Sequence, residues 1–155
     1  MAMTTTRSDL KQKLFLKRKS PLHQTMRCEL CGAQAATDLH EVWISRRQAQ
    51  GNDELTQAIL ECEYNLALLC NPCNLRRAET ALGRAFLRQK LIYQYGAGPI
   101  QDWIAKLPFR VESTRQEFLA EIQTVARRIA EHEAELAEMK AELAKSKCGP
   151  TTAAF

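Results

Sequence analysis

The sequence predicts an α+β protein with a small core and a long helix at its C-terminal end. Three features of the 155 residues lead to this fold class. Two Cys-x-x-Cys pairs supply four thiols, two short apolar segments rich in strand-forming residues lie between the pairs, and an apolar heptad repeat occupies the last part of the chain. A chain of this length can bury one core of modest size.

Residues 1–27 are predicted to be a basic segment that contains one short helix over residues 9–19. Its apolar positions at helical spacing are Leu10, Leu14 and Phe15, and its candidate N-terminal caps are Ser8 and Asp9. Such a helix either docks its apolar stripe on the core, which is the simpler interpretation, or contacts phosphate groups.

Charge is distributed unevenly along the chain. Residues 1–111 contain 16 Lys and Arg against 10 Asp and Glu, whereas residues 112–155 contain 6 against 8. The basic part of the chain is therefore the part that would attract an anionic partner such as nucleic acid, although a solvated basic surface accounts for the excess equally well.

Two short strands are predicted on either side of a polar connection. Residues 38–44 end in β-branched and aromatic residues, and residues 64–70 form an apolar run that leads directly into the second cysteine pair. Residues 46–63 between them are polar, with Gly51-Asn52-Asp53 as a turn signal, and are predicted to be a long connection.

After the second cysteine pair, one helix is predicted over residues 75–95. Apolar residues recur there at spacings of three and four, and a Gly-Ala-Gly-Pro sequence ends the pattern. A shorter amphipathic helix is expected at residues 100–107, with Trp103 and Ile104 buried. Together with the strands, these helices make a predicted domain over residues 28–110.

The C-terminal segment, residues 111–147, is predicted to be a coiled-coil helix. Its apolar seam runs at alternating steps of four and three through Phe118, Ile122, Val125, Ile129, His132, Leu136, Met139 and Leu143. A helix over residues 112–147 would be about 54 Å long, too long to hide its stripe on so small a domain. We therefore expect a homodimer or pairing with another protein's helix; the alternative is that the stripe folds back on the N-terminal helix. Residues 148–155 are predicted to be a disordered tail.

The apolar segments are too short for a membrane span, and residues 1–20 lack the apolar stretch of a secretory signal. We therefore expect a protein of the cytoplasm without a membrane partner. Thiols stay reduced in that compartment, so the cysteine pairs are better suited to a metal than to disulfides.

The two-residue gap within each pair lets both sulfurs reach one zinc ion at about 2.3 Å. The predicted ligands are Cys28, Cys31, Cys70 and Cys73, and the predicted bystanders are Cys62 and Cys148. Four thiolates leave no open position on the ion, so this zinc is predicted to be structural and any chemistry must use other residues.

Taken together, the segments CELCG, DLHEV and NLALLCNPCN resemble the HNH, or ββα-metal (His-Me finger), endonuclease family in its form with a four-cysteine zinc. The resemblance covers about a third of the chain, residues 28–79. The segment LLCNPCN is similar to the phage recombination endonucleases, which cut branched DNA. The resemblance implies a ββα-metal core, a phage or mobile-element origin, and hydrolysis of DNA in the cytoplasm of a bacterium or of a phage-infected host.

In this family a hard divalent ion, usually Mg²⁺ or Mn²⁺, neutralises the scissile phosphate while a base takes a proton from the attacking water. The resemblance makes Asn74 a ligand of this catalytic ion, although Asn is also a common helix cap. It makes Asn65 a residue that orders the connecting loop by hydrogen bonds, although Asn is also an ordinary turn residue.

The strand around His40 admits two registers. In the first, His40 binds the ion and Glu41 stands at the position of the base, where a carboxylate is a weaker base than the family's imidazole. In the second, His40 is the base and Asp38, which shares its strand face, takes the ligand position. Because the first register departs from the usual His-His or Asp-His pair, an inactive HNH fold that binds nucleic acid or a host protein is a third interpretation.

Five arginines are candidates for phosphate contacts, although each alone is an ordinary solvated residue. They are Arg46 and Arg47 after the strand, and Arg76, Arg77 and Arg84 on the following helix. The leading hypothesis is a dimeric, metal-dependent DNA endonuclease of the HNH class. The alternatives are a zinc-stabilised nucleic-acid-binding module and a protein-binding adaptor.

Overall fold

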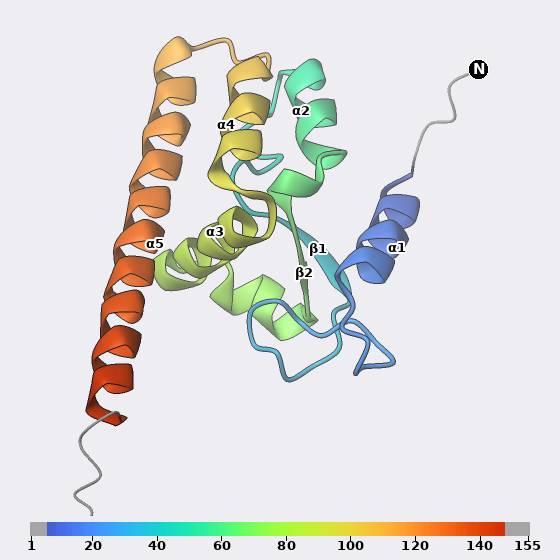
Figure 1. Ribbon diagram of the computed structural model, residues 1–155. Helices are drawn as coiled ribbons and strands as arrows, with labels where there is room; N and C mark the ends of the chain where they lie inside the picture. Colours follow the sequence, from blue (N-terminus) through green and yellow to red (C-terminus); the bar gives the residue numbers. More distant parts are fainter. Residues whose placement is uncertain (1–5, 148–155) are drawn as a thin grey trace, which may run out of the picture.

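The computed structural model describes residues 6–147 and shows a mainly helical α+β arrangement with one small antiparallel sheet (Figure 1). The sheet lies between helix α1 (Arg7–Arg18) on one side and the helices of residues 81–147 on the other. The long helix α5 (Glu112–Lys147) forms the side of the molecule opposite α1. The α+β class and the long C-terminal helix are therefore confirmed, whereas the predicted tail lies outside the described residues.

Helix α1 docks on the sheet through the apolar stripe that the sequence predicts. Leu10 and Leu14 are buried in a cluster with Leu66 and Leu68 of the sheet. The cap, however, is Thr6 rather than Ser8 or Asp9. Asp9 instead occupies the third helical position, where its carboxylate accepts a hydrogen bond from the backbone N–H of Thr6 and completes a capping box.

Strands β1 (Asp38–Glu41) and β2 (Leu66–Leu69) are antiparallel, with His40 opposite Ala67. The sequence predicts the first strand over residues 38–44, but the strand ends at Glu41. Residues 42–44 are buried but are not part of the sheet. The backbone N–H groups of Trp43 and Ile44 donate to the side-chain oxygen of Asn65 instead of to a neighbouring strand. An internal side chain has replaced the strand partner here.

The polar connection between the strands contains a helix that the sequence analysis did not predict. Helix α2 (Asp53–Leu60) begins at the Asn52 cap and buries Leu55 and Ile59, and the short 3₁₀ helix η1 (Glu63–Asn65) leads from it into β2. The Gly51-Asn52-Asp53 sequence, which predicts a turn, instead contains the cap that starts this helix, and eight residues are too few for an extended periodic pattern.

The prediction of a single helix over residues 75–95 is wrong, because the segment forms two helical pieces. It is divided into a short helical segment η2 (Cys73–Arg77), in which the N–H of Ala78 bonds to the carbonyl of Cys73, and helix α3 (Ala81–Tyr95). Thr80 separates the two: its hydroxyl donates to the Arg77 carbonyl and accepts from the N–H of Gly83. Threonine is a strong cap, and this local competition ends one helix and starts another.

Gly96, with φ of 85°, ends α3, and helix α4 (Ala97–Lys106) follows at once, three residues earlier than predicted. Ile104 is fully buried as expected, whereas Trp103 is only half-buried.

The apolar seam of α5 is buried in its first half and exposed in its second half. Ile122 is fully buried and Phe118 and Ile129 are each 8% exposed, because this half packs on α3 and α4. The rest of the helix extends past them (Figure 1), and Leu136 and Leu143 are 50% and 56% exposed. The chain's own helices thus cover the first half of the seam, and the N-terminal helix covers neither half.

Within residues 6–147, no helix combines the length and the apolar character that a bilayer span would require.

Candidate functional site

Two neighbouring groups of polar side chains occupy the region where β1, β2 and η2 meet. The first is the cysteine cluster. The Sγ atoms of the two pairs all lie within 4.8 Å of one another, and Cys31 Sγ is 3.9 Å from Cys70 Sγ. Each pair is closed by a backbone hydrogen bond, from Gly32 N–H to the Cys28 carbonyl and from Asn74 N–H to the Cys70 carbonyl.

The four cysteines fit a metal such as zinc. Hydrogen bonds from the backbone of Gln34 and Ala33 lower the pKa of Cys31 to about 6, whereas desolvation raises the pKa of Cys73 to about 12. Thiolates packed this closely repel one another, and a cation with two positive charges removes that repulsion. The set of donors therefore matches the predicted ligands. Cys62 lies outside the cluster, is half-buried, and has its pKa raised to about 11 by burial, whereas Cys148 lies outside the described residues.

Helix α1 is fixed to the first cysteine pair by a buried ion pair. Arg18 donates to the carboxylate of Glu29, which lies between Cys28 and Cys31, at 2.9 Å, and both side chains are at most 4% exposed. The same Glu29 oxygen accepts from the backbone N–H of Leu68 in β2. This carboxylate joins the cysteine turn, the sheet and α1 into one rigid unit.

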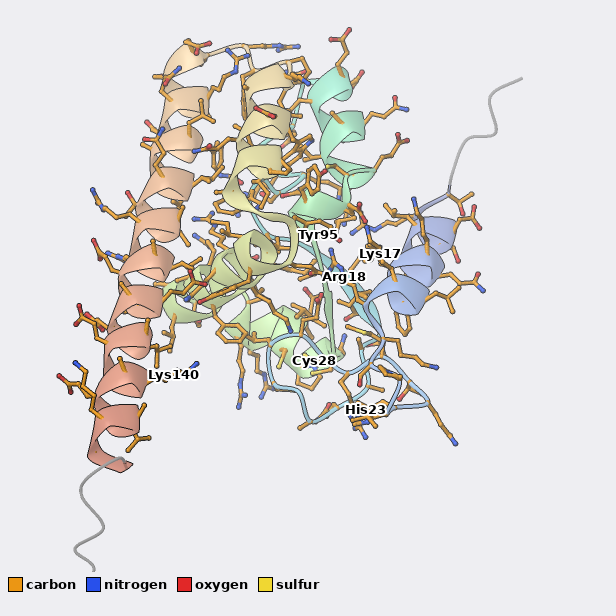
Figure 2. The ribbon with its side chains drawn as sticks, viewed as in Figure 1. Lys17, Arg18, His23, Cys28, Tyr95 and Lys140 are labelled. Carbon is orange, nitrogen blue, oxygen red and sulfur yellow. The ribbon has the colours of Figure 1, made fainter. Side chains whose placement is uncertain are left out.

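The Arg18 guanidinium also contacts Tyr95, the last residue of α3. Figure 2 shows Lys17 and Arg18 of α1 lying close to Tyr95. Arg18 donates to the Tyr95 hydroxyl at 2.9 Å, and this hydroxyl donates to Glu63, which also pairs with Lys17 at 2.8 Å. The position of α1 relative to the core is therefore set by several charged hydrogen bonds as well as by its apolar stripe.

The second group lies beside the cysteines and contains His40 and Asn74. His40 Nδ1 is 2.9 Å from Asn74 Oδ1, and the Asn74 amide donates to Asp38 at 3.3 Å. His40 Nε2 is 3.6 Å from a carboxylate oxygen of Glu79. Asp38 and His40 share one face of β1, and the second cysteine pair turns the chain so that Asn74, at the start of η2, meets that face.

Glu41 is hydrogen-bonded to different side chains. It follows His40 in the strand, so its side chain is directed to the opposite face of the sheet. Its carboxylate accepts from Arg7 at 2.8 Å and from Arg46 at 3.3 Å, and the side chain is only 12% exposed. The structure thus groups Asp38, not Glu41, with His40 and Asn74.

Asn65 is fully buried and makes four hydrogen bonds. Its oxygen accepts from the N–H groups of Trp43 and Ile44, and its amide donates to the carbonyls of Ile44 and Ile59. These bonds join the segment after β1 to α2 and to the start of β2. They are the contacts that a loop-ordering role requires.

The predicted arginines differ in their surroundings. Arg46 pairs with Glu41, and Arg84 pairs with Glu79 at 3.0 Å, while the exposed arginines Arg47, Arg76 and Arg77 form no ion pair within the described part of the chain. Sequence reasoning missed Arg7 and Glu79. Both reach the site from separate elements, and no spacing in the sequence connects them with it.

The chain was compared with known proteins in three ways, and no family model, curated protein or solved structure matches it.

Proposed function

We propose that the protein is a metal-dependent endonuclease of the HNH class that hydrolyses phosphodiester bonds in DNA. The observation that supports this most directly is the convergence of Asp38, His40 and Asn74 on a two-stranded sheet and the helical segment after it. These side chains come from two separate parts of the sequence motif, strand β1 and the start of η2, and they bring two oxygen ligands and one imidazole to a single place.

We assign Asp38 and Asn74 as the residues that would hold the catalytic Mg²⁺ or Mn²⁺, since carboxylate and amide oxygens are suitable ligands for hard cations. The bound ion would supply the positive charge that stabilises the phosphate and the leaving oxygen. This assignment follows the second register of the strand, because Glu41 is held by two arginines on the other face of the sheet.

His40 then acts as the general base. An imidazole nitrogen takes the proton of the attacking water, and the resulting imidazolium is stabilised by Glu79, whose carboxylate lies 3.6 Å from Nε2. Asn74 Oδ1, in contact with Nδ1, holds the ring in one orientation. A structural zinc at the four cysteines fixes the turn from which Asn74 projects.

The end of α5 supports a proposal for the partner. Leu136, Met139 and Leu143 form an exposed apolar row at heptad spacing beyond the part of the helix that α3 and α4 cover. A second copy of the chain pairing through this row would hold two cutting sites in a fixed relation, which suits a two-strand cut or a branched substrate.

The same row favours a second candidate function, a zinc-stabilised module that binds a host protein or nucleic acid without cutting. An exposed apolar row of this kind is typical of protein-binding surfaces. The two functions differ in one property, namely whether a phosphodiester bond is broken.

The test is nicking of supercoiled plasmid and of a four-way DNA junction with magnesium or manganese. His40→Ala and Asn74→Ala are compared with His23→Ala, an exposed histidine outside the site. Cutting by the wild type and by His23→Ala, with loss of about 10²-fold or more in the other two, supports the endonuclease. Equal cutting by all variants, or none by the wild type, rejects it, with zinc content and circular dichroism checking that each variant is folded.

A further inference from the structure

A solvent-open hollow of about 490 Å³ crosses the free edge of β1, next to the candidate site. Its lining contains Asp38 and Asn74 on one side and the α1 residues Arg7 and Lys11 on the other, with Arg46 beside them. Strand β1 has β2 as its only partner in the described sheet, so its other edge is available to a ligand.

The two arginines of the hollow are held in place by one carboxylate. Arg7 Nη2 donates to Glu41 at 2.8 Å and to the Leu39 carbonyl at 3.2 Å, and Arg46 Nε contacts the same Glu41 oxygen at 3.3 Å. This explains the acidic residue at the strand position where the family pattern places its base. Glu41 orients two guanidinium groups at the rim of the hollow.

Arg7 keeps an unused donor. Its Nη1 atom is buried and has no hydrogen-bond partner within residues 6–147. A buried donor of a charged group without an acceptor is costly. The Arg7 side chain as a whole lines the hollow and is 34% exposed, so part of this cation is open to an anion there.

The rim carries an excess of positive charge, and the helix that provides two of its residues is fixed to the core. Leu10 and Leu14 fasten α1 to the sheet, and Arg18 fastens its last turn to Glu29 and Tyr95. Among the residues that line the hollow, three are cationic and only Asp38 is acidic. Arg and Lys side chains grouped opposite a carboxylate and an amide are the arrangement expected where a phosphate backbone passes a metal-binding site.

We infer that Arg7, Lys11 and Arg46 form a phosphate-binding rim. This rim holds the DNA backbone on the α1 side of Asp38 and Asn74, with Glu41 as the positioning residue for the two arginines. The inference rests on the proposed function for the identity of the ligand. The inference makes α1 part of the DNA interface, and it places the DNA backbone across the free edge of β1.

The test measures binding of a short fluorescein-labelled DNA duplex by fluorescence anisotropy, without added magnesium, over a series of salt concentrations. Lys11→Glu is compared with Lys13→Glu, which makes the same charge change on the same helix. Lys13 does not line the hollow and lies near Glu63 instead. Lys11→Gln serves as the milder variant if charge reversal disturbs folding.

The expected result is a Kd raised about tenfold by Lys11→Glu, with the salt slope reduced by about one, and a change below about twofold for Lys13→Glu. Glu41→Gln is the second variant, because it makes the protein more positive. Charge alone predicts tighter binding by Glu41→Gln, whereas loss of the arginine alignment predicts weaker binding, which is the outcome we expect.

Equal effects of Lys11→Glu and Lys13→Glu, or tighter binding by Glu41→Gln, would overturn the rim, as would a wild-type protein that does not bind the duplex at low salt. The nicking assay separates this result from the proposed function. Selective weakening by Lys11→Glu in a protein that never cuts DNA supports the rim and rejects the endonuclease. DNA cutting by the wild type, with equal effects of the two lysine variants on binding, supports the endonuclease and rejects the rim.

Discussion

His40 Nδ1 and Asn74 Oδ1 lie 2.9 Å apart although 34 positions of sequence separate the two residues. The contact depends on three local structures: the alternation of β1, its pairing with β2, and the tight turn of the second cysteine pair. Each of these structures is short, and the small sheet has only four residue pairs. The sheet and the turn of the second cysteine pair together position the candidate site.

The two registers of the strand can be separated by kinetics. We expect Asp38→Asn to lower kcat by about 10²-fold, because it removes the carboxylate that accepts the Asn74 hydrogen bond and that we assign to the metal ion. Glu41→Gln should leave kcat within a few-fold and raise KM, since Glu41 acts on Arg7 and Arg46. Steady-state plasmid nicking measures both constants. A large loss of kcat in Glu41→Gln with little change in Asp38→Asn would instead indicate that Glu41 is the general base.

Loss of one cysteine of the four-cysteine cluster should destabilise the core strongly, whereas loss of the half-buried Cys62 should not. Cys70→Ser is expected to release the metal and to cost several kcal/mol, on the order of 3 or more, because binding energy at a structural site is folding energy. Cys62→Ser is the control, with an expected change within about 1 kcal/mol. Zinc analysis by mass spectrometry and thermal unfolding monitored by circular dichroism measure the effects. Equal melting temperatures for the two variants would contradict a structural metal.

Much of this architecture could be predicted from the sequence, and the failures have physical causes. The four cysteines and the 36-residue C-terminal helix were predictable because spacing alone defines them. Helix α2 and the break at Thr80 were not. The Gly51-Asn52-Asp53 sequence before α2 fits a turn as well as a helix cap, and a break made by one threonine hydroxyl with residues three positions away leaves no mark on the apolar periodicity. Likewise, Arg7 and Glu79 join the site only through the folded structure.

The break between η2 and α3 requires glycine at position 83. A Cβ there would overlap the Arg77 carbonyl and crowd the Thr80 hydroxyl. We expect Gly83→Ala to destabilise the protein by about 1–3 kcal/mol and to lower nicking by displacing η2, which carries Asn74. Gly98→Ala is the matched control, since no heavy atom lies within 4 Å of its added Cβ. Chemical unfolding provides the comparison, and equal stability of the two variants would show that the break tolerates a side chain.

Stability should fall on the alkaline side because of the contact between α1 and Tyr95. Burial raises the pKa of Tyr95 above its ordinary value of 10.0, so the unfolded chain loses this proton at a lower pH than the folded protein does. Stability is therefore lost as pH rises past 10. The hydrogen bond to Glu63 raises the pKa of Lys17 above 10.5, and its contribution is likewise present below that value and lost as the folded protein's lysine deprotonates.

Tyr95→Phe removes the first of these effects. Its free energy of unfolding, from urea titrations, should fall less than that of the wild type between neutral pH and values just above 10. Because both proteins keep the cysteine cluster and Lys17, the difference isolates the phenol. An identical alkaline loss in the two proteins would place the cause outside this contact.

Substitutions in the seam of α5 should act on folding in its first half and on association in its second. Ile122 is fully buried on α3 and α4, so Ile122→Ala is expected to cost about 2–4 kcal/mol. The double variant Leu136→Asp, Leu143→Asp changes residues that are at least half exposed, and its effect on monomer stability should stay within about 1 kcal/mol.

The same double variant should convert a dimer into a monomer, because a charge at a heptad core position is not accommodated between two helices. Light scattering after size-exclusion chromatography measures the mass of both proteins at matched concentration. Ile129 is unsuitable for this purpose, since at 8% exposure it packs within the chain and a charge there would disturb folding. A wild-type protein that is monomeric at every concentration, or a double variant that stays dimeric, would remove the end of α5 as the self-association surface.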